Sequence, residues 1–167
     1  MEKKRLKIAL VAHDARKQEL IDWCRFNMDT LLNHDIVATG TTSKLIKEMF
    51  MEHDYPSEYI GGFDEMKRYY DYKVKSLLSG PLGGDQQIGA MIAQGEIDVL
   101  IFFCDNLITQ GHQQDVGALS RLASLYNIAF ATNRTTADMI ISSPLFDDKD
   151  YNRIIPTAIE SYKNRKL

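Results

Sequence analysis

The sequence has few of the features that mark several common classes of protein. Its two cysteines, Cys24 and Cys104, lie in no spacing typical of a disulfide framework or a zinc site. The longest unbroken apolar run, residues 99–104, is far too short to cross a bilayer. Charged residues form no long run of one sign and sum to a net charge of -3. We therefore expect no nucleic-acid partner and no membrane association.

The length indicates a single self-sufficient domain over residues 1–167, because a chain of this size buries roughly 70% of its unfolded surface. Residues 1–5 lead directly into a strand-like segment and show no signal-peptide core. With so few cysteines, the composition suits a reducing compartment. We expect a cytoplasmic protein.

Strand-like segments alternate with helical patterns along most of the chain. The expected strands are residues 6–12, 35–38, 74–78, 97–103 and 128–131, with a further short one at 154–155. The expected helices are residues 18–32, the run after 43, 86–94, 114–125, 133–141 and 157–165. This alternation predicts an α/β fold, a doubly wound domain with a mainly parallel five-stranded sheet flanked by helices.

Residues 50–72 do not follow this alternation of strands and helices. The segment is rich in tyrosine and holds a helical pattern over residues 64–72. We interpret it as an insertion that serves as an oligomer contact or as neutral surface, in preference to a lid.

A glycine-rich loop over residues 79–87 stands between an expected strand and an expected helix. Such a loop lets backbone N–H groups approach a phosphate, and the following helix offers the positive end of its dipole. Its carboxylate, Asp85, has two interpretations. It is either the N-cap of the helix or a base beside a bound phosphate ester.

Other polar residues also follow expected strands. They are His13-Asp14, Thr39-Gly40-Thr41-Thr42 and Asp105. Ligands of doubly wound sheets bind outside the carboxyl ends of the strands, so we expect these residues to share one site with the glycine loop. The threonine hydroxyls and the nearby Lys17 suit a phosphate.

Two other kinds of site are a metal centre and a catalytic nucleophile. His13, Asp14, His112 and Asp115 are ligand types for zinc or iron, but the other histidines fall in a loop and in the insertion, so we expect no metal. A nucleophile is less favoured, because Cys104 ends a buried strand and Ser79 has no evident histidine partner.

Five motifs together resemble the methylglyoxal synthase family over nearly the whole chain. They are Val11-Ala12-His13-Asp14 with Lys17, Ala38-Thr39-Gly40-Thr41-Thr42, Leu78-Ser79-Gly80-Pro81 with Gly83-Gly84-Asp85-Gln86-Gln87, Ile97-Asp98-Val99-Leu100-Ile101-Phe102-Phe103 with Asp105, and Ala131-Thr132-Asn133 with Thr136-Ala137-Asp138. The resemblance implies a lyase that converts dihydroxyacetone phosphate to methylglyoxal and inorganic phosphate through an ene-diolate, a bypass of glycolysis, without metal or organic cofactor.

Carried over position by position, the resemblance implies that Asp85 is the catalytic base and that His112 handles protons on the enediol oxygens. Asp105 and Asp14 match supporting carboxylates. The residues that match the phosphate cradle or lie near it are His13, Lys17, Thr39, Gly40, Thr41, Thr42, Ser79, Gly80 and Asp115. The chain departs from the family where residues 106–111 lack prolines and where residues 50–72 lengthen the link before the glycine loop.

The resemblance further implies an allosteric homohexamer that inorganic phosphate inhibits. The main alternative is a non-catalytic domain of the same fold that senses a phosphate ligand, and a third is a phosphate-binding or assembly protein without turnover. Asp85, Asp105 and His112 occurring together favour the enzyme.

Overall fold

The computed structural model describes residues 4–53, 62–107 and 113–165. It contains one five-stranded sheet in which every strand pair is parallel, which confirms the α/β architecture expected from the sequence. The strands are β1 (Lys7–Ala12), β2 (Asp35–Ala38), β3 (Val74–Ser76), β4 (Val99–Phe103) and β5 (Ala129–Ala131). The helices are α1 (Lys17–Phe26), α2 (Met28–Leu31), α3 (Gly40–His53), α4 (Phe63–Lys73), α5 (Gly84–Ala93), α6 (Gln113–Leu125), α7 (Arg134–Ile141) and α8 (Thr157–Lys163), with 3-10 turns η1 (Asp14–Arg16) and η2 (Gly80–Leu82).

The strand order β3-β2-β1-β4-β5 places β1 at the centre of the sheet. From β1 the chain adds β2 and then β3 on one side of the sheet. It then crosses to the other side of β1 to add β4 and β5, so the strand order reverses direction beside β1. In register, Ala12 lies opposite Phe103, and Leu10 lies opposite Ala38. The carboxyl ends of β1, β2 and β4 therefore meet at one edge, where doubly wound folds bind ligands.

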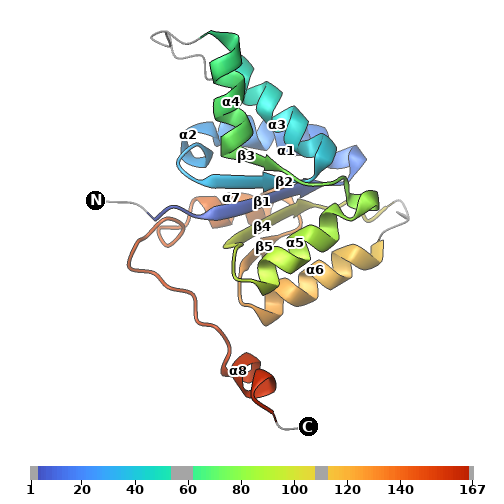
Figure 1. Cartoon of the computed structure of the whole chain (residues 1–167), viewed down its shortest axis with the longest axis vertical. Coiled ribbons are helices and arrows are strands. Elements are labelled where there is room, and N and C mark those ends of the chain that lie inside the picture. The colour runs from blue at the N-terminus through green and yellow to red at the C-terminus, as the bar shows by residue number, and fades with distance from the viewer. Residues whose placement is uncertain (1–3, 54–61, 108–112, 166–167) are drawn as a thin grey trace.

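Helices cover both faces of the sheet (Figure 1). Alternate side chains of a strand point to opposite faces. Ile8 and Leu10 accordingly join the core under α1, α3 and α7, whereas Ala9 and Val11 join the core under α5 and α6. Both cores bury the central strands, which explains why β4 is apolar at every position. In the described ranges, no helix is both long and apolar enough to span a bilayer.

Two local expectations differ from the structure. The expected helix over residues 18–32 is divided at Asn27, whose backbone leaves the helical region and whose side-chain amide donates to the carbonyl oxygen of Trp23. Ile154 and Ile155 form no strand, so that prediction is wrong. The Ile154 carbonyl oxygen instead accepts a hydrogen bond from the Asn127 side chain, as the segment leads away from the sheet toward α8 (Figure 1).

The loop between β3 and α5 folds tightly against its own start. The Gly84 N–H donates to the Ser79 carbonyl oxygen at 3.0 Å. A Cβ atom at Gly84 would lie 2.1 Å from the Leu78 carbonyl oxygen and 3.0 Å from the Thr39 side chain. Real Cβ atoms do not approach backbone so closely, so only glycine allows α5 to begin at this place.

We predict that Gly84→Ala lowers the free energy of unfolding by at least about 2 kcal/mol, because an added methyl group must displace backbone. Gly117→Ala is the matched control. Nothing lies within 4 Å of a Cβ at Gly117 in the middle of α6, so this change is expected to raise stability by about 0.5–1 kcal/mol. Denaturant titration of both variants measures the difference, and equal stabilities would show that the loop does not need the close approach.

Candidate active site

A cavity of about 220 Å³ opens at the carboxyl edge of the sheet, beside β1. Four separate segments line it, each following or ending a strand. Its lining residues are Val11, Ala12, His13, Asp14, Lys17, Thr39, Thr41, Thr42, Ser79, Gly80, Pro81, Asp85 and Phe102. The cavity thus collects most of the polar residues that the sequence placed at strand ends.

The first turn of α3 forms one wall of this cavity. Thr42 is 1% exposed, and among the described residues its hydroxyl oxygen has no hydrogen-bond partner. A buried hydroxyl without a partner is costly unless a ligand or water supplies one. The free N–H groups of a helix start and this hydroxyl together suit an anion.

Gly40 lies behind this wall and does not line the cavity. A Cβ at Gly40 would lie 3.0 Å from the Ser79 backbone nitrogen. Its N–H donates to the Leu78 carbonyl oxygen at 3.1 Å. Glycine therefore lets the turn after β2 press against the loop after β3, so that both loops face one cavity.

Lys17 places a single ammonium group at the cavity. Its Nζ forms an ion pair with Asp14 Oδ1, one turn earlier in the chain. The Lys17 side chain is 20% exposed, whereas that of Asp14 is 92% exposed. An exposed ion pair of this kind contributes little stability, so an anionic ligand competes readily with Asp14 for the lysine.

Asp85 is the buried carboxylate of the site. It is 2% exposed and lies in the first turn of α5, whose N-cap is Gly83. The N-cap interpretation of Asp85 is therefore wrong. Asp85 also lines a second hollow, a groove of about 340 Å³ between α5 and α6. Because it lies in the first turn, the helix dipole favours its negative charge.

His13 is held in place by the chain segment after β4. The Asp105 N–H donates to His13 Nδ1 at 2.8 Å, and the buried ring packs edge-on against Phe102 at 5.1 Å between centroids. Because Nδ1 accepts this bond, the proton of a neutral His13 ring is on Nε2. Asp105 itself is buried behind His13, and its Oδ1 accepts from the Leu107 N–H. Asp105 thus supports the site through its backbone amide.

Cys104 stays a protonated thiol at neutral pH. Its pKa is raised to about 11, mainly by burial, while Arg16 opposes the rise and the Asp85 carboxylate adds to it. A thiolate is the nucleophilic form of cysteine. The structure therefore does not favour Cys104 as a nucleophile, in agreement with the sequence analysis.

Three predicted site residues do not line the cavity, and a fourth lies outside the described residues. Gly40 and Asp105 support it from behind. Asp115 lies in the α5–α6 groove and accepts a hydrogen bond from Gln86. His112 falls outside the described residues, so its role stays a prediction.

Phe102 lines the cavity, although it was not among the predicted site residues. The alternation of side chains along β4 was the available signal, since Phe102 shares its face with Leu100 and the Val11 of the neighbouring strand. In the part of the chain that the structure describes, no three histidine, cysteine, aspartate or glutamate side chains are grouped to hold a metal ion.

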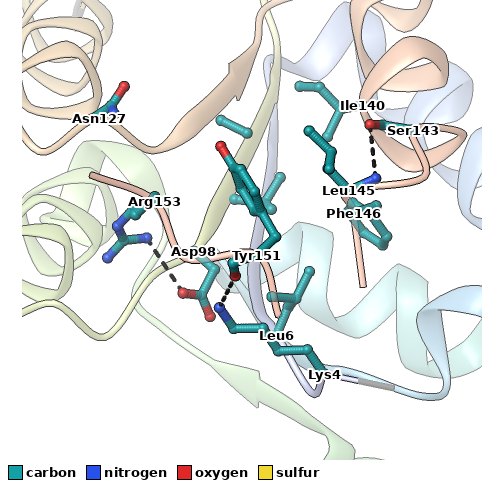
Figure 2. Close-up of a pocket in the computed structure, with 12 residues that line it drawn as sticks. Lys4, Leu6, Asp98, Asn127, Ile140, Ser143, Leu145, Phe146, Tyr151 and Arg153 are labelled. Carbon is teal, nitrogen blue, oxygen red and sulfur yellow. Dashed lines mark hydrogen bonds and ion pairs between the residues drawn. The ribbon is translucent and has the colours of Figure 1, made fainter. Parts of the chain in front are cut away.

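A separate cavity of about 220 Å³ lies at the opposite edge of the sheet, near the amino ends of β1, β4 and β5 (Figure 2). Its polar side chains hold the segment that leads to α8. Lys4 Nζ donates to the Tyr151 carbonyl oxygen, and Arg153 donates to Asp98. None of the predicted site residues lines it.

Comparison with known proteins gives consistent results. A family model described as the MGS-like domain matches residues 19–132. The methylglyoxal synthase of Maridesulfovibrio salexigens is 48% identical over 161 residues, which cover 96% of each chain. The methylglyoxal synthase of Clostridium acetobutylicum is 46% identical over 89% of each chain. A crystal structure of methylglyoxal synthase from Elizabethkingia anophelis NUHP1 matches with a TM-score of 0.78 at 39% identity, covering 99% of this chain and 96% of that chain.

We predict that Thr42→Val raises the free energy of unfolding by about 1 kcal/mol in phosphate-free buffer, because it removes a buried hydroxyl that lacks a partner. The same change is expected to weaken stabilisation by added inorganic phosphate, which binding to the folded state produces. Denaturant titration with and without phosphate measures both effects.

Ser43→Ala serves as the control for Thr42→Val. The Ser43 hydroxyl is also buried but donates to the Gly40 carbonyl oxygen at 2.7 Å. This variant is expected to lose about 1 kcal/mol of stability and to keep its phosphate response. A full phosphate response in Thr42→Val would remove the hydroxyl from the anion site.

Proposed function

The chain belongs to the methylglyoxal synthase family, which confirms the resemblance found in its motifs, and we propose that it converts dihydroxyacetone phosphate to methylglyoxal and inorganic phosphate. The observation that carries the proposal is the buried Asp85 carboxylate on the wall of a cavity built from helix starts and hydroxyls. Such a cavity holds a phosphate ester beside a base.

The phosphate of the substrate is proposed to lie against the first turn of α3 and the loop after β3. Backbone N–H groups and hydroxyls supply the hydrogen bonds, and Lys17 supplies positive charge. The proposed binding residues are His13, Lys17, Thr39, Gly40, Thr41, Thr42, Ser79 and Gly80, and Asp115 is proposed to support the site from α6 without touching the phosphate. Gly40 contributes by allowing the two loops to touch.

Asp85 is proposed to remove a proton from the carbon between the carbonyl group and the free hydroxyl of the substrate. The electron pair of the broken C–H bond then forms the carbon–carbon double bond of an ene-diolate. The former free hydroxyl then loses its proton to become the aldehyde, and the electron pair of the double bond expels inorganic phosphate, which takes up that proton. The enolate that remains receives on its terminal carbon the proton held by Asp85, which gives methylglyoxal. Over these reaction steps, the atoms and charges of dihydroxyacetone phosphate equal those of methylglyoxal and inorganic phosphate together.

Expulsion of phosphate requires that the breaking C–O bond stand in line with the π system of the ene-diolate. A rigid cradle fixes this orientation and stabilises the departing anion. A positioned base contributes typically about 10²–10⁴-fold, so much of the acceleration must come from this electrostatic stabilisation.

The other proposed catalytic residues are Asp14, Asp105 and His112, and the binding residue His13 lies beside them. His13 offers its Nε2–H from the buried side of the cavity, because Nδ1 is engaged by the Asp105 amide. Asp14 pairs with Lys17 at the rim. His112 is proposed to handle protons on the enediol oxygens, as the family resemblance implies.

We also propose a cytoplasmic homo-oligomer, a hexamer, in which inorganic phosphate inhibits turnover. Phosphate is the product of the proposed reaction and carries the group that the cradle binds. It therefore competes with the substrate for the same hydroxyls and N–H groups. Sedimentation and steady-state kinetics test the two parts separately.

Asp85→Asn is expected to lower kcat by about 10²–10⁴-fold, because the amide keeps the shape of the carboxylate but does not accept the proton. Affinity for inorganic phosphate should not fall, because the change removes a negative charge that repels the anion. An assay of both methylglyoxal and phosphate release measures turnover, and Asp64→Asn on the exposed face of α4 is the control. A near-normal kcat in Asp85→Asn would exclude Asp85 as the catalytic base. A folded wild-type protein that binds phosphate but does not turn over the substrate would favour the sensing alternative.

Lys17→Ala is expected to weaken the binding of substrate and of inorganic phosphate together, each by about ten- to a hundredfold, since a hydrogen bond from a charged donor contributes about 1.5–3 kcal/mol. Lys44→Ala, which removes a lysine that is 75% exposed on α3, is the control. Calorimetric titration with phosphate measures affinity. An unchanged affinity would place Lys17 among ordinary surface lysines.

A further inference from the structure

Gln86 links the two helices that meet beside Asp85. It follows Asp85 in the first turn of α5, and its Nε2 donates to Asp115 Oδ1 at 2.8 Å across 29 residues of chain. Asp115 lies in the first turn of α6. The core between these helices is formed by apolar side chains such as Ile88 and Leu119. The amide therefore fixes the start of α6 against the start of α5.

Asp115 and Asp85 line the same groove of about 340 Å³, although Asp85 also lines the substrate cavity. Asp85 thus borders both hollows, and Asp115 borders the groove. Within the described part of the chain, no lysine or arginine lines this groove. Gln86 supplies a neutral N–H donor there, which orients a carboxylate without adding charge beside Asp85.

We propose that Gln86 is a positioning residue for the reaction, acting through Asp115. It holds the Asp115 carboxylate, and with it the first turn of α6, in a fixed place next to the helix start that carries Asp85. The inference rests on the proposed function, because it assigns Gln86 to the turnover of that site. A displacement of reacting groups by about 1 Å costs as much as about 10²-fold in rate, so a fixed helix start matters to turnover.

Loss of a residue that positions reacting groups lowers kcat, whereas loss of a residue that only supports the fold lowers stability. The hydrogen bond between Gln86 and Asp115 is exposed to solvent, where water replaces a lost partner and the cost to stability is small. Gln86 does not line the cavity that is proposed to hold phosphate. Its removal is therefore expected to lower kcat while stability and phosphate affinity stay unchanged.

Gln86→Leu and Gln86→Glu test this in the full chain. The leucine removes the donor at similar size, and the glutamate sets a second negative charge against Asp115. We expect about tenfold lower kcat for leucine and a larger fall for glutamate, since about 1.4 kcal/mol corresponds to tenfold. Gln94→Leu, at the exposed far end of α5, is the control and is expected to leave kcat unchanged.

A double-mutant cycle identifies the route of the effect. If Gln86 acts through Asp115, adding Gln86→Leu to Asp115→Leu lowers kcat little further, because leucine at position 115 offers no acceptor to Gln86. Additive losses in the cycle, or a Gln86→Leu variant with normal kcat, would overturn the inference while the proposed function stands. Absence of methylglyoxal from the wild type would overturn both. If Gln86→Leu does not fold, Gln86→Glu carries the same cycle.

Discussion

Close backbone contact between the turn after β2 and the loop after β3 is the constraint on which the site depends. The Leu77 N–H donates to the Ala38 carbonyl oxygen, and the Gly40 N–H donates to the Leu78 carbonyl oxygen. These bonds continue the parallel pairing of β2 and β3 beyond the strand ends. Gly84 completes the arrangement, because its missing side chain lets α5 start directly against the same loop. The hydroxyls of α3 and the carboxylate of α5 therefore face one cavity.

Electrostatics explains why this cavity is built mainly from backbone and hydroxyl groups. A phosphate ester and the Asp85 carboxylate are both negative, and two like charges about 6 Å apart repel by roughly 3 kcal/mol at an effective dielectric constant of about 20. Among the described residues that line the cavity, Lys17 is the one lysine or arginine, and Asp14 shares it. Helix starts and hydroxyls must offset the rest of the repulsion. Their partial charges bind phosphate while weakening the Asp85 base less than a cluster of full positive charges would.

The sequence was sufficient to predict the parallel sheet and the strand ends that form the site. Continuous apolar runs mark strands that are buried on both faces, and the polar residues that follow them mark where those strands end. It did not predict how particular groups are used. The bond from the Asp105 amide to His13 is one that the sequence did not indicate, and the role of the Asp105 carboxylate stays a prediction. The bond from Gln86 to Asp115 joins residues that no periodicity relates. The apolar pair at Ile154 suggested a strand, but two residues carry too little pattern to fix a pairing partner. The domain count, the hexamer and the role of His112 stay predictions.

The most direct test of the account is a crystal structure of the protein with a phosphate-bearing mimic of the ene-diolate bound. The account predicts that the phosphate of the mimic lies on the first turn of α3 and the Ser79 loop, with an Asp85 carboxylate oxygen in contact with the atom that replaces the reacting carbon. A mimic bound elsewhere, or bound in this cavity with Asp85 out of contact, would contradict it.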